Sequence, residues 1–331
     1  MANNIGFGKI YDCTWWGVGV NNDISWGITY KDLAGPATSD DFIITVKTDN
    51  AGTSADNQFT IPTTGTGFLY DITTSDGYTA TGVTGNHTIT FPSAGEYEVK
   101  ISGSFPYIKF AGGGDRLKLL EIKNWGIYGI GSSTQNEAFE NCTNLTISAT
   151  DGGEGFANVA NFGFNIFTGA FIGCASMTNF PVINTSGGVD FRGSWYNSGI
   201  TSFPTLDFSN AKSFQDAWRN CSSLVSFPLV NFSSVDGTGI SAGFQNAWFD
   251  CSSLTTIPVG LFDGVLATNF SNTFGNTNLT TNSIDNVLVS IESNGTSNGT
   301  FTQSGGSAPS AVGLAAISSL ISKGWTITYT T

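Results

Sequence analysis

The chain has 331 residues, of which 40% are hydrophobic, 11% are charged and 42 are glycine. This hydrophobic content is enough for a sizeable core, and the low charge with abundant Gly, Ser, Thr and Asn predicts strands and turns rather than helices. A net charge of −13 with only 12 Lys and Arg residues excludes nucleic acid as a partner, because affinity for phosphates comes from clustered cations.

Residues 1–40 are dense in aromatic side chains and glycine. Such a segment is unfavourable in water unless it packs on a neighbouring domain or docks into a partner. We therefore interpret Tyr11, Trp15, Trp16 and Trp26 as attachment residues, with an ordinary pair of strands as the alternative. The first residues lack the pattern of a secretory signal and no later stretch reaches 18 apolar residues, so neither export by the usual route nor membrane insertion is expected.

From residue 41 to 110, short apolar runs alternate with turn residues. The expected strands are 42–46, 58–61, 68–72, 87–91 and 96–101. Strands this closely spaced predict a small β-sandwich. The order Asp76-Gly77, His87-Thr88, Gly95-Glu96-Tyr97-Glu98-Val99 is similar to PKD-type sandwiches, in which D-G, H-T and G-x-Y-x-V recur. The tryptophan-containing strand that precedes D-G in that family is absent.

A repeated unit occupies residues 111–280. Its clearest copies, 217–228 and 247–258, both follow A-W-x-x-C-S-S-L-x-x-[FI]-P, and the copies start at 138, 170, 194, 217, 247 and 273. Spacings of 23 to 32 residues are the length of a leucine-rich-repeat coil, which predicts a solenoid.

Two side-chain patterns within the unit predict its packing. The rows 224/227/229, 254/257/259 and 177/180/182 have L-x-x-L-x-L spacing, which predicts that all three positions face the core at the end of a strand-like segment. Aromatic residues four apart, such as Phe214 and Trp218, predict one short helical turn at the back of each coil.

Four of the five cysteines fall at one position of the repeat. They are Cys142, Cys174, Cys221 and Cys251, and Ser198 takes this position in the intervening copy. A column of small buried thiols explains this spacing better than disulfides or a metal site do. We therefore predict free cysteines.

The run A-[FW]-x-x-C-x-x-L, followed by a strand-like segment, resembles the BspA-like leucine-rich repeats of bacterial and phage surface proteins over residues 134–280. The resemblance implies an irregular leucine-rich-repeat solenoid that serves as a display scaffold with variable faces. Variable positions in the two clearest copies are the receptor-facing candidates Ser223, Val225, Ser226, Ser253, Thr255 and Thr256.

Residues 281–331 no longer repeat. Ser283 is the expected N-cap of a helix over 284–291, and a second helix should begin after Ser310, end near Gly324 and lead into a strand. A helix-helix-strand unit of this kind would cover the open end of the solenoid. The segment resembles the C-terminal caps of phage tail proteins that carry repeats.

Catalytic, cofactor and metal sites are not expected. His87, the single histidine, lies in a strand context that predicts a packing role. The run 151–154, Asp-Gly-Gly-Glu, lacks the alternating oxygen ligands of a calcium loop. Acidic residues recur at turns of the repeats, which favours capping over a glycosidase pair; they are Asp190, Asp207, Asp216 and Asp250.

These patterns together predict a mainly β protein: a small β-sandwich, then an irregular leucine-rich-repeat solenoid with a C-terminal α/β cap. Our functional hypothesis is a phage virion structural protein, a tail-fibre or adhesin-like appendage without enzymatic activity. Its partners would be other virion proteins and a host cell-surface protein or glycan, and we expect a homo-oligomer, a trimer being one such form. The alternatives are a tailspike polysaccharide depolymerase and a bacterial surface adhesin.

Overall fold

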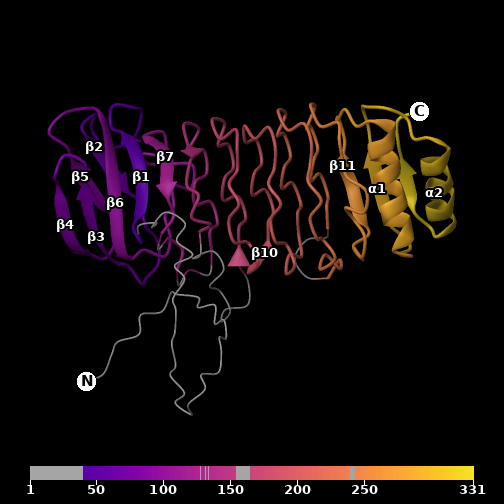
Figure 1. The fold of residues 1–331 in the computed structure, drawn as a ribbon, viewed down its shortest axis with the longest axis horizontal. Helices are drawn as coiled ribbons and strands as arrows, with labels where there is room; N and C mark the ends of the chain where they lie inside the picture. Colours follow the sequence, from indigo (N-terminus) through magenta and orange to yellow (C-terminus); the bar gives the residue numbers. More distant parts are fainter. Residues whose placement is uncertain (1–39, 127, 131, 133, 154–164, 239–242) are drawn as a thin grey trace, which may run out of the picture. The chain divides into compact units, whose positions relative to one another are not determined.

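The computed structural model describes residues 40–331, apart from 127, 131, 133, 154–164 and 239–242. The chain divides into two compact units, Met1–Thr38 and Ser39–Thr331, and every described residue belongs to the second. This part is mainly β, with thirteen strands and two helices among its described residues (Figure 1). The proposed attachment residues Tyr11, Trp15, Trp16 and Trp26 lie outside the described residues.

Two sheets begin the described chain. The larger has the strand order β4-β3-β6-β1-β7-β8, and the smaller pairs β2 with β5. The strands are β1 Phe42–Lys47, β2 Gln58–Ile61, β3 Leu69–Thr74, β4 Thr79–Val83, β5 His87–Thr90, β6 Glu96–Ser104, β7 Leu119–Asn124 and β8 Thr146–Ile147. Neighbours are antiparallel except for β7 and β8. The five predicted strands are present, and β4, β7 and β8 are additional.

The larger sheet continues beyond residue 110. Ile44 of β1 is paired with Val99 of β6 on one side and with Ile122 of β7 on the other. All three side chains are fully buried. Because β1 is rich in β-branched residues and pairs along both edges, strands from both sides of the predicted 110/111 boundary share one sheet.

A buried polar cluster joins the segment before β7 to the loop before β2. Asp115 is 1% exposed, and its carboxylate accepts hydrogen bonds from the amides of Thr53, Ser54 and Thr60 at 2.7–3.0 Å. The fully buried Lys118 ammonium donates to the carbonyl and hydroxyl oxygens of Ser54 at 3.1 and 2.9 Å. These contacts satisfy both buried charged groups with polar atoms of the loop before β2 and of β2 itself.

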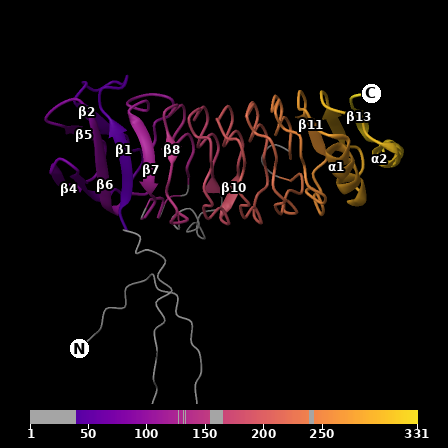
Figure 2. The ribbon, with the colours of Figure 1, turned by 45° about the horizontal axis from the view of Figure 1, so that its top comes forward.

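Between β8 and β11 the chain forms successive coils, each of which contains one copy of the repeated unit. Parallel bridges connect Asn179 to Ser202, Ser202 to Ser226, and Ser226 to Thr256. Two short strands, β9 Asn165–Ile166 and β10 Gly188–Asp190, also pair in parallel. Figures 1 and 2 show these coils lying side by side.

The predicted short helical turn at the back of each coil is wrong. In its place is a run of turns, in which alternate amides donate to the next coil: Gly193 to the Gln215 carbonyl at 2.9 Å and Trp195 to the Ala217 carbonyl at 2.8 Å. Amides that point along the stack cannot donate to carbonyls four residues earlier, so no α-helix forms. The geometry requires positive φ at two positions per coil, and Asn, Asp or Gly usually fills them.

The inward-facing residues recur every third position rather than in the predicted L-x-x-L-x-L pattern. Leu224, Phe227 and Val230 are 0–6% exposed, whereas Leu229 is 55% exposed. The equivalent residues Val182 and Val259 are also exposed, contrary to the prediction. Strand-like alternation would be needed to turn Leu229 inward, but this segment has isolated bridges instead of a continuous strand.

Aromatic columns fill the interior of the coils. Trp195, Trp218, Trp248 and Phe274 are fully buried, and neighbouring rings stack with centroids 4.9–5.4 Å apart and planes within 10°. A second column of stacked rings contains Phe167, Phe191, Phe214, Phe244 and Phe270. The register of the coils therefore places equivalent aromatic residues directly against one another.

The cysteine column is confirmed for the described cysteines. Cys142, Cys174, Cys221 and Cys251 are free and buried. The thiols of Cys174, Cys221 and Cys251 donate to the carbonyls of Phe139, Trp195 and Trp218 at 3.0–3.2 Å, so these three thiols contact the preceding coil. Burial raises the pKa of Cys221 to about 11.

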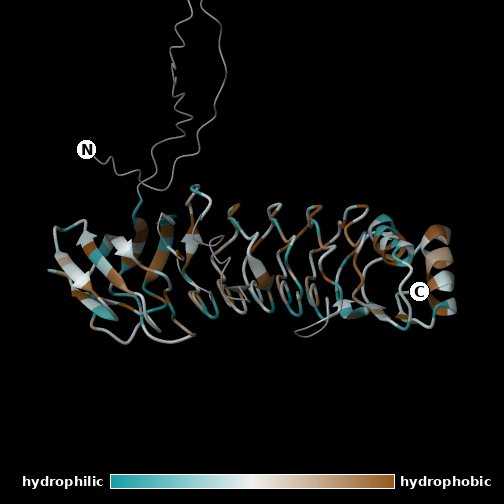
Figure 3. Cartoon of the chain, turned by 90° about the horizontal axis from the view of Figure 1, so that it is seen from below, coloured by the Kyte–Doolittle hydropathy of each residue, from teal (hydrophilic) through white to brown (hydrophobic). Residues whose placement is uncertain are grey.

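The C-terminal part contains three parallel strands and two helices. The strands are β11 Asn269–Phe274, β12 Thr300–Gln303 and β13 Thr326–Thr328. The helix α1 Thr281–Ser293 is capped by Thr280 instead of Ser283, whose hydroxyl donates to the Thr255 carbonyl at 2.9 Å. The second helix, α2 Ala311–Ser322, begins after Ser310 as predicted, and the Ser310 side chain caps it. Hydrophobic stretches are visible on α2 in Figure 3.

Candidate functional site

The two predicted receptor-facing triplets lie next to each other on adjacent coils. They are Ser223, Val225 and Ser226, and Ser253, Thr255 and Thr256, and all six are exposed or half-buried. The amide of Thr255 donates to the Val225 carbonyl at 2.9 Å, and Ser226 is bridged to Thr256. The structure thus brings the six residues together into one patch, which we call the Ser226 surface.

Main-chain hydrogen bonds between coils support the Ser226 surface. The amide of Val225 donates to the Thr201 carbonyl at 3.1 Å, and the amide of Thr201 donates to the Thr178 carbonyl at 2.9 Å. The hydroxyl groups of Thr201 and Thr255 add bonds of 3.2 Å to the preceding coil. Because the row is held by the backbone, the outward side chain at Val225 can change without loss of pairing.

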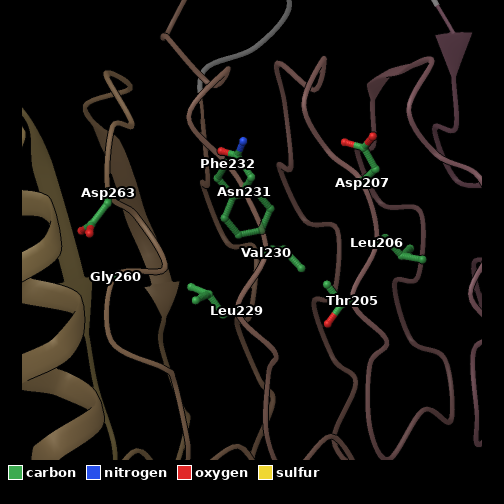
Figure 4. Close-up of a pocket in the computed structure, with 9 residues that line it drawn as sticks. All are labelled: Thr205, Leu206, Asp207, Leu229, Val230, Asn231, Phe232, Gly260 and Asp263. Atoms are coloured by element: carbon green, nitrogen blue, oxygen red, sulfur yellow. The ribbon is translucent and has the colours of Figure 1, made fainter.

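A groove lies beside the Ser226 surface, immediately after the proline of each coil (Figure 4). It is an open hollow of about 640 Å³ that is lined by residues of three coils. Leu229 occupies its middle, with Asp207 and Asp263 on either side. We call this hollow the Leu229 groove.

The sequence prediction missed the Leu229 groove because it placed Leu229 and Val259 in the core. Leu224 and Phe227 fit both a two-residue alternation and a three-residue period, and the patterns differ only at the next position. The three-residue period also accounts for Ile183 and Val230, which are buried. This period in the sequence could have identified Leu229 as an exposed residue.

The carboxylates of the groove accept hydrogen bonds from neighbouring groups. Asp207 accepts the amide of Ser209 at 2.9 Å, and Asp263 accepts the hydroxyl of Ser290 at 2.5 Å. Asp207 therefore caps a turn, which is the role that the sequence predicts. Asp250 accepts the side-chain amide of Asn276 at 2.7 Å.

Two other residues that the sequence singled out also contact neighbours. His87 contacts the hydroxyl of Tyr78 through Nε2 at 2.7 Å, and desolvation lowers the pKa of its imidazole. Asp151 accepts the amides of Trp125 at 3.0 Å and Gly126 at 2.6 Å. Both contacts serve to hold strands and turns together.

A second hollow, of about 420 Å³, lies on the runs of turns. Within each coil these turns precede the segment that lines the Leu229 groove. Arg192, Tyr196, Asp216 and Arg219 line it. The sequence prediction missed this cluster, because its members come from coils of unequal length and meet only through the register of the stack. We call it the Arg219 hollow.

Within the described part of the chain, no group of three or more His, Cys, Asp or Glu side chains is arranged to hold a metal ion. Neither α1 nor α2 has the length and apolar character needed to cross a membrane, and the described residues contain no other helix. No protein-family model, curated protein or solved structure matches this chain.

Proposed function

We propose that this chain is a phage virion structural protein, a tail-fibre or adhesin-like appendage that presents its coils to the host surface without catalysing a reaction. One observation carries the proposal: buried and exposed residues are separated within each coil. Leu224, Phe227 and Val230 are buried, while Val225 and Leu229 are exposed. Outward positions can therefore vary to match a receptor while the inward positions hold the fold.

The same proposal assigns an architecture to each part of the chain. Residues 41–110 would form most of a PKD-like β-sandwich, to which β7 from the following segment adds a strand. Residues 111–280 would otherwise form an irregular BspA-like leucine-rich-repeat solenoid, and residues 281–331 its α/β cap. The parallel bridges from Asn179 to Thr256 and the continuation of the ladder into β12 and β13 support it. A covered end is what a stack of coils needs to remain soluble.

The proposed receptor is a host cell-surface protein or glycan that contacts the Ser226 surface and the Leu229 groove. Recognition through small polar side chains and one exposed apolar row gives modest affinity at each site, and several copies on one particle would raise avidity. A homo-oligomer, such as a trimer, fits this role. Residues 1–40, with Tyr11, Trp15, Trp16 and Trp26, would bind other virion proteins.

The experiment is a binding isotherm of the fluorescently labelled full chain on candidate host bacteria. Leu229→Asn combined with Val259→Asn should weaken binding at least tenfold, because both side chains are exposed in the wild type. Val312→Asn, at another exposed apolar position, is the matched control and should bind as the wild type does. Equal binding by all three proteins would remove the groove from the receptor site.

The alternative with structural support is a tailspike polysaccharide depolymerase, because Asp207 and Asp263 lie on either side of the Leu229 groove (Figure 4). Glycoside hydrolysis uses two carboxylates across the scissile bond. Release of reducing sugar from host polysaccharide by the wild type, and its loss in both Asp207→Asn and Asp263→Asn, would favour the enzyme. Our proposal expects no release.

A further inference from the structure

The Arg219 hollow contains two guanidinium groups that are fixed before any ligand arrives. Arg192 donates through Nε to both oxygens of Asp190 at 2.9 and 3.0 Å and through Nη2 to Oδ2 at 2.7 Å. Asp190 is 1% exposed and also accepts the hydroxyl of Thr168 at 3.1 Å. This bidentate contact with a buried carboxylate sets the plane of the Arg192 guanidinium.

Arg219 is held by a different set of contacts. Its Nη1 donates to Asp216 at 3.2 Å, and its guanidinium carbon lies 5.8 Å from the ring centroid of Tyr196 and 5.2 Å from that of Phe249. These distances fit cation–π contacts with one ring on the preceding coil and one on the following coil. Asp216 is in turn fixed by the side-chain amide of Asn246 at 3.0 Å.

The charges in the hollow balance. Two guanidinium groups, Arg192 and Arg219, face two carboxylates, Asp190 and Asp216. The hollow has no net positive charge to attract an anionic ligand. Such a ligand would also be repelled by the half-buried carboxylate of Asp216. A neutral ligand whose groups both donate and accept hydrogen bonds suits this arrangement better, because guanidinium groups only donate and carboxylates only accept.

The shape of the hollow agrees with a small ring-shaped ligand. Gly193 lies at a position where the next two coils carry Asp216 and Asn246, so one side chain is missing from the floor. Arg219 lies over the ring of Tyr196, so that ring face is not free for stacking. Recognition must therefore come mainly from hydrogen bonds and from the edge of the Tyr196 ring.

We propose that the Arg219 hollow binds a neutral sugar residue, whose adjacent hydroxyl groups accept from Arg192 and Arg219 and donate to Asp216 and to the Gln215 side-chain oxygen. The rigid guanidinium groups reduce the entropy lost on binding. The proposal rests on the proposed function only for the source of the sugar, a host-surface polysaccharide. The binding itself is independent of it.

The test applies the full chain to an array on which neutral hexose oligosaccharides and their uronic-acid analogues are printed side by side. The wild type should bind a neutral oligosaccharide more tightly than its acidic analogue. Arg219→Gln and Gln215→Ala should each weaken that binding at least tenfold without a change in melting temperature, because both side chains are partly exposed. Lys100→Gln, on an exposed cation of β6, is the matched control.

Arg192→Lys adds a variant that keeps the charge beside the buried Asp190 but removes the bidentate fork, and it should also weaken binding. Wild-type protein that binds no neutral oligosaccharide, or binding that is equal in wild type, Arg219→Gln and Gln215→Ala, overturns the proposal. Cell binding that survives in these variants would leave the proposed function standing. Array binding without any cell binding would refute the host claim and retain the sugar site.

Discussion

Trp218 and Trp248, which lie 30 residues apart in the sequence, stack with ring centroids 4.9 Å apart and planes inclined by 10°. Phe227 meets both rings edge-on at 4.7 and 4.9 Å. Offset and edge-to-face contacts of this kind add to the stabilisation from burial itself. The spacing between coils is thus the contact distance of two aromatic rings.

Replacing one tryptophan of this column should destabilise the protein strongly. Trp218→Ala removes a fully buried side chain and leaves a cavity between two coils, at a cost of about 3–5 kcal/mol. Trp248→Ala should behave similarly. Tyr196→Phe, which keeps the ring at a half-buried position, is the control. Chemical unfolding monitors the effect, and a midpoint unchanged in Trp218→Ala would show that the column is not a source of stability.

Leu229 and Val230 offer a direct comparison of the outward and inward positions of one coil. Leu229→Ser should change the free energy of unfolding by less than about 0.5 kcal/mol, as is usual for exposed sites. Val230→Ser should cost about 1–3 kcal/mol, since it places a hydroxyl at a buried apolar position. Equal effects in thermal or urea unfolding would contradict the three-residue period.

The thiols of the described cysteines should not react in the native protein. Burial raises the pKa of Cys221 to about 11 and raises those of Cys142, Cys174 and Cys251 as well. At pH 8 the reactive thiolate is therefore scarce as well as buried. A disulfide reagent should label at most Cys13 before denaturation and five cysteines afterwards, as read by intact mass. Two or more labels in the native protein would contradict this structure of the coils.

Asp115→Ala should destabilise the N-terminal sheets by about 3–5 kcal/mol, because it leaves the amides of Thr53, Ser54 and Thr60 without their acceptor and removes the negative charge near the buried Lys118 ammonium. Burial acts to raise the pKa of Asp115, but hydrogen bonds from Ser54 and Thr60 outweigh it and hold the pKa below 3.8. The stability from this group is therefore present above pH 3.8 and is lost as the pH falls through the native pKa. Asp115→Ala should lack this part of the acid dependence, which urea unfolding between pH 2 and 6 can measure. Parallel profiles for the two proteins would contradict the assignment.

The columns of Trp218 and Cys221 could be predicted from the sequence, because identical letters at one repeat position become neighbours in any stack of coils. The position of Leu229 could not, since a two-residue and a three-residue pattern agree up to Phe227. The contact of Asp115 with Ser54 joins residues 61 apart, and no local pattern indicates it. The Arg219 hollow depends on the register between coils of different lengths, which only the structure provides.

If the exposed face of the coils recognises a host, as we propose, the purified chain should compete for phage adsorption. Particles that carry this protein are mixed with host cells and increasing amounts of the purified full chain, and the fraction of adsorbed particles is counted. Wild-type chain should reduce adsorption, and the Leu229→Asn, Val259→Asn variant should need at least tenfold more protein for the same effect. Adsorption that is unchanged by saturating wild-type chain would contradict host recognition by the coils.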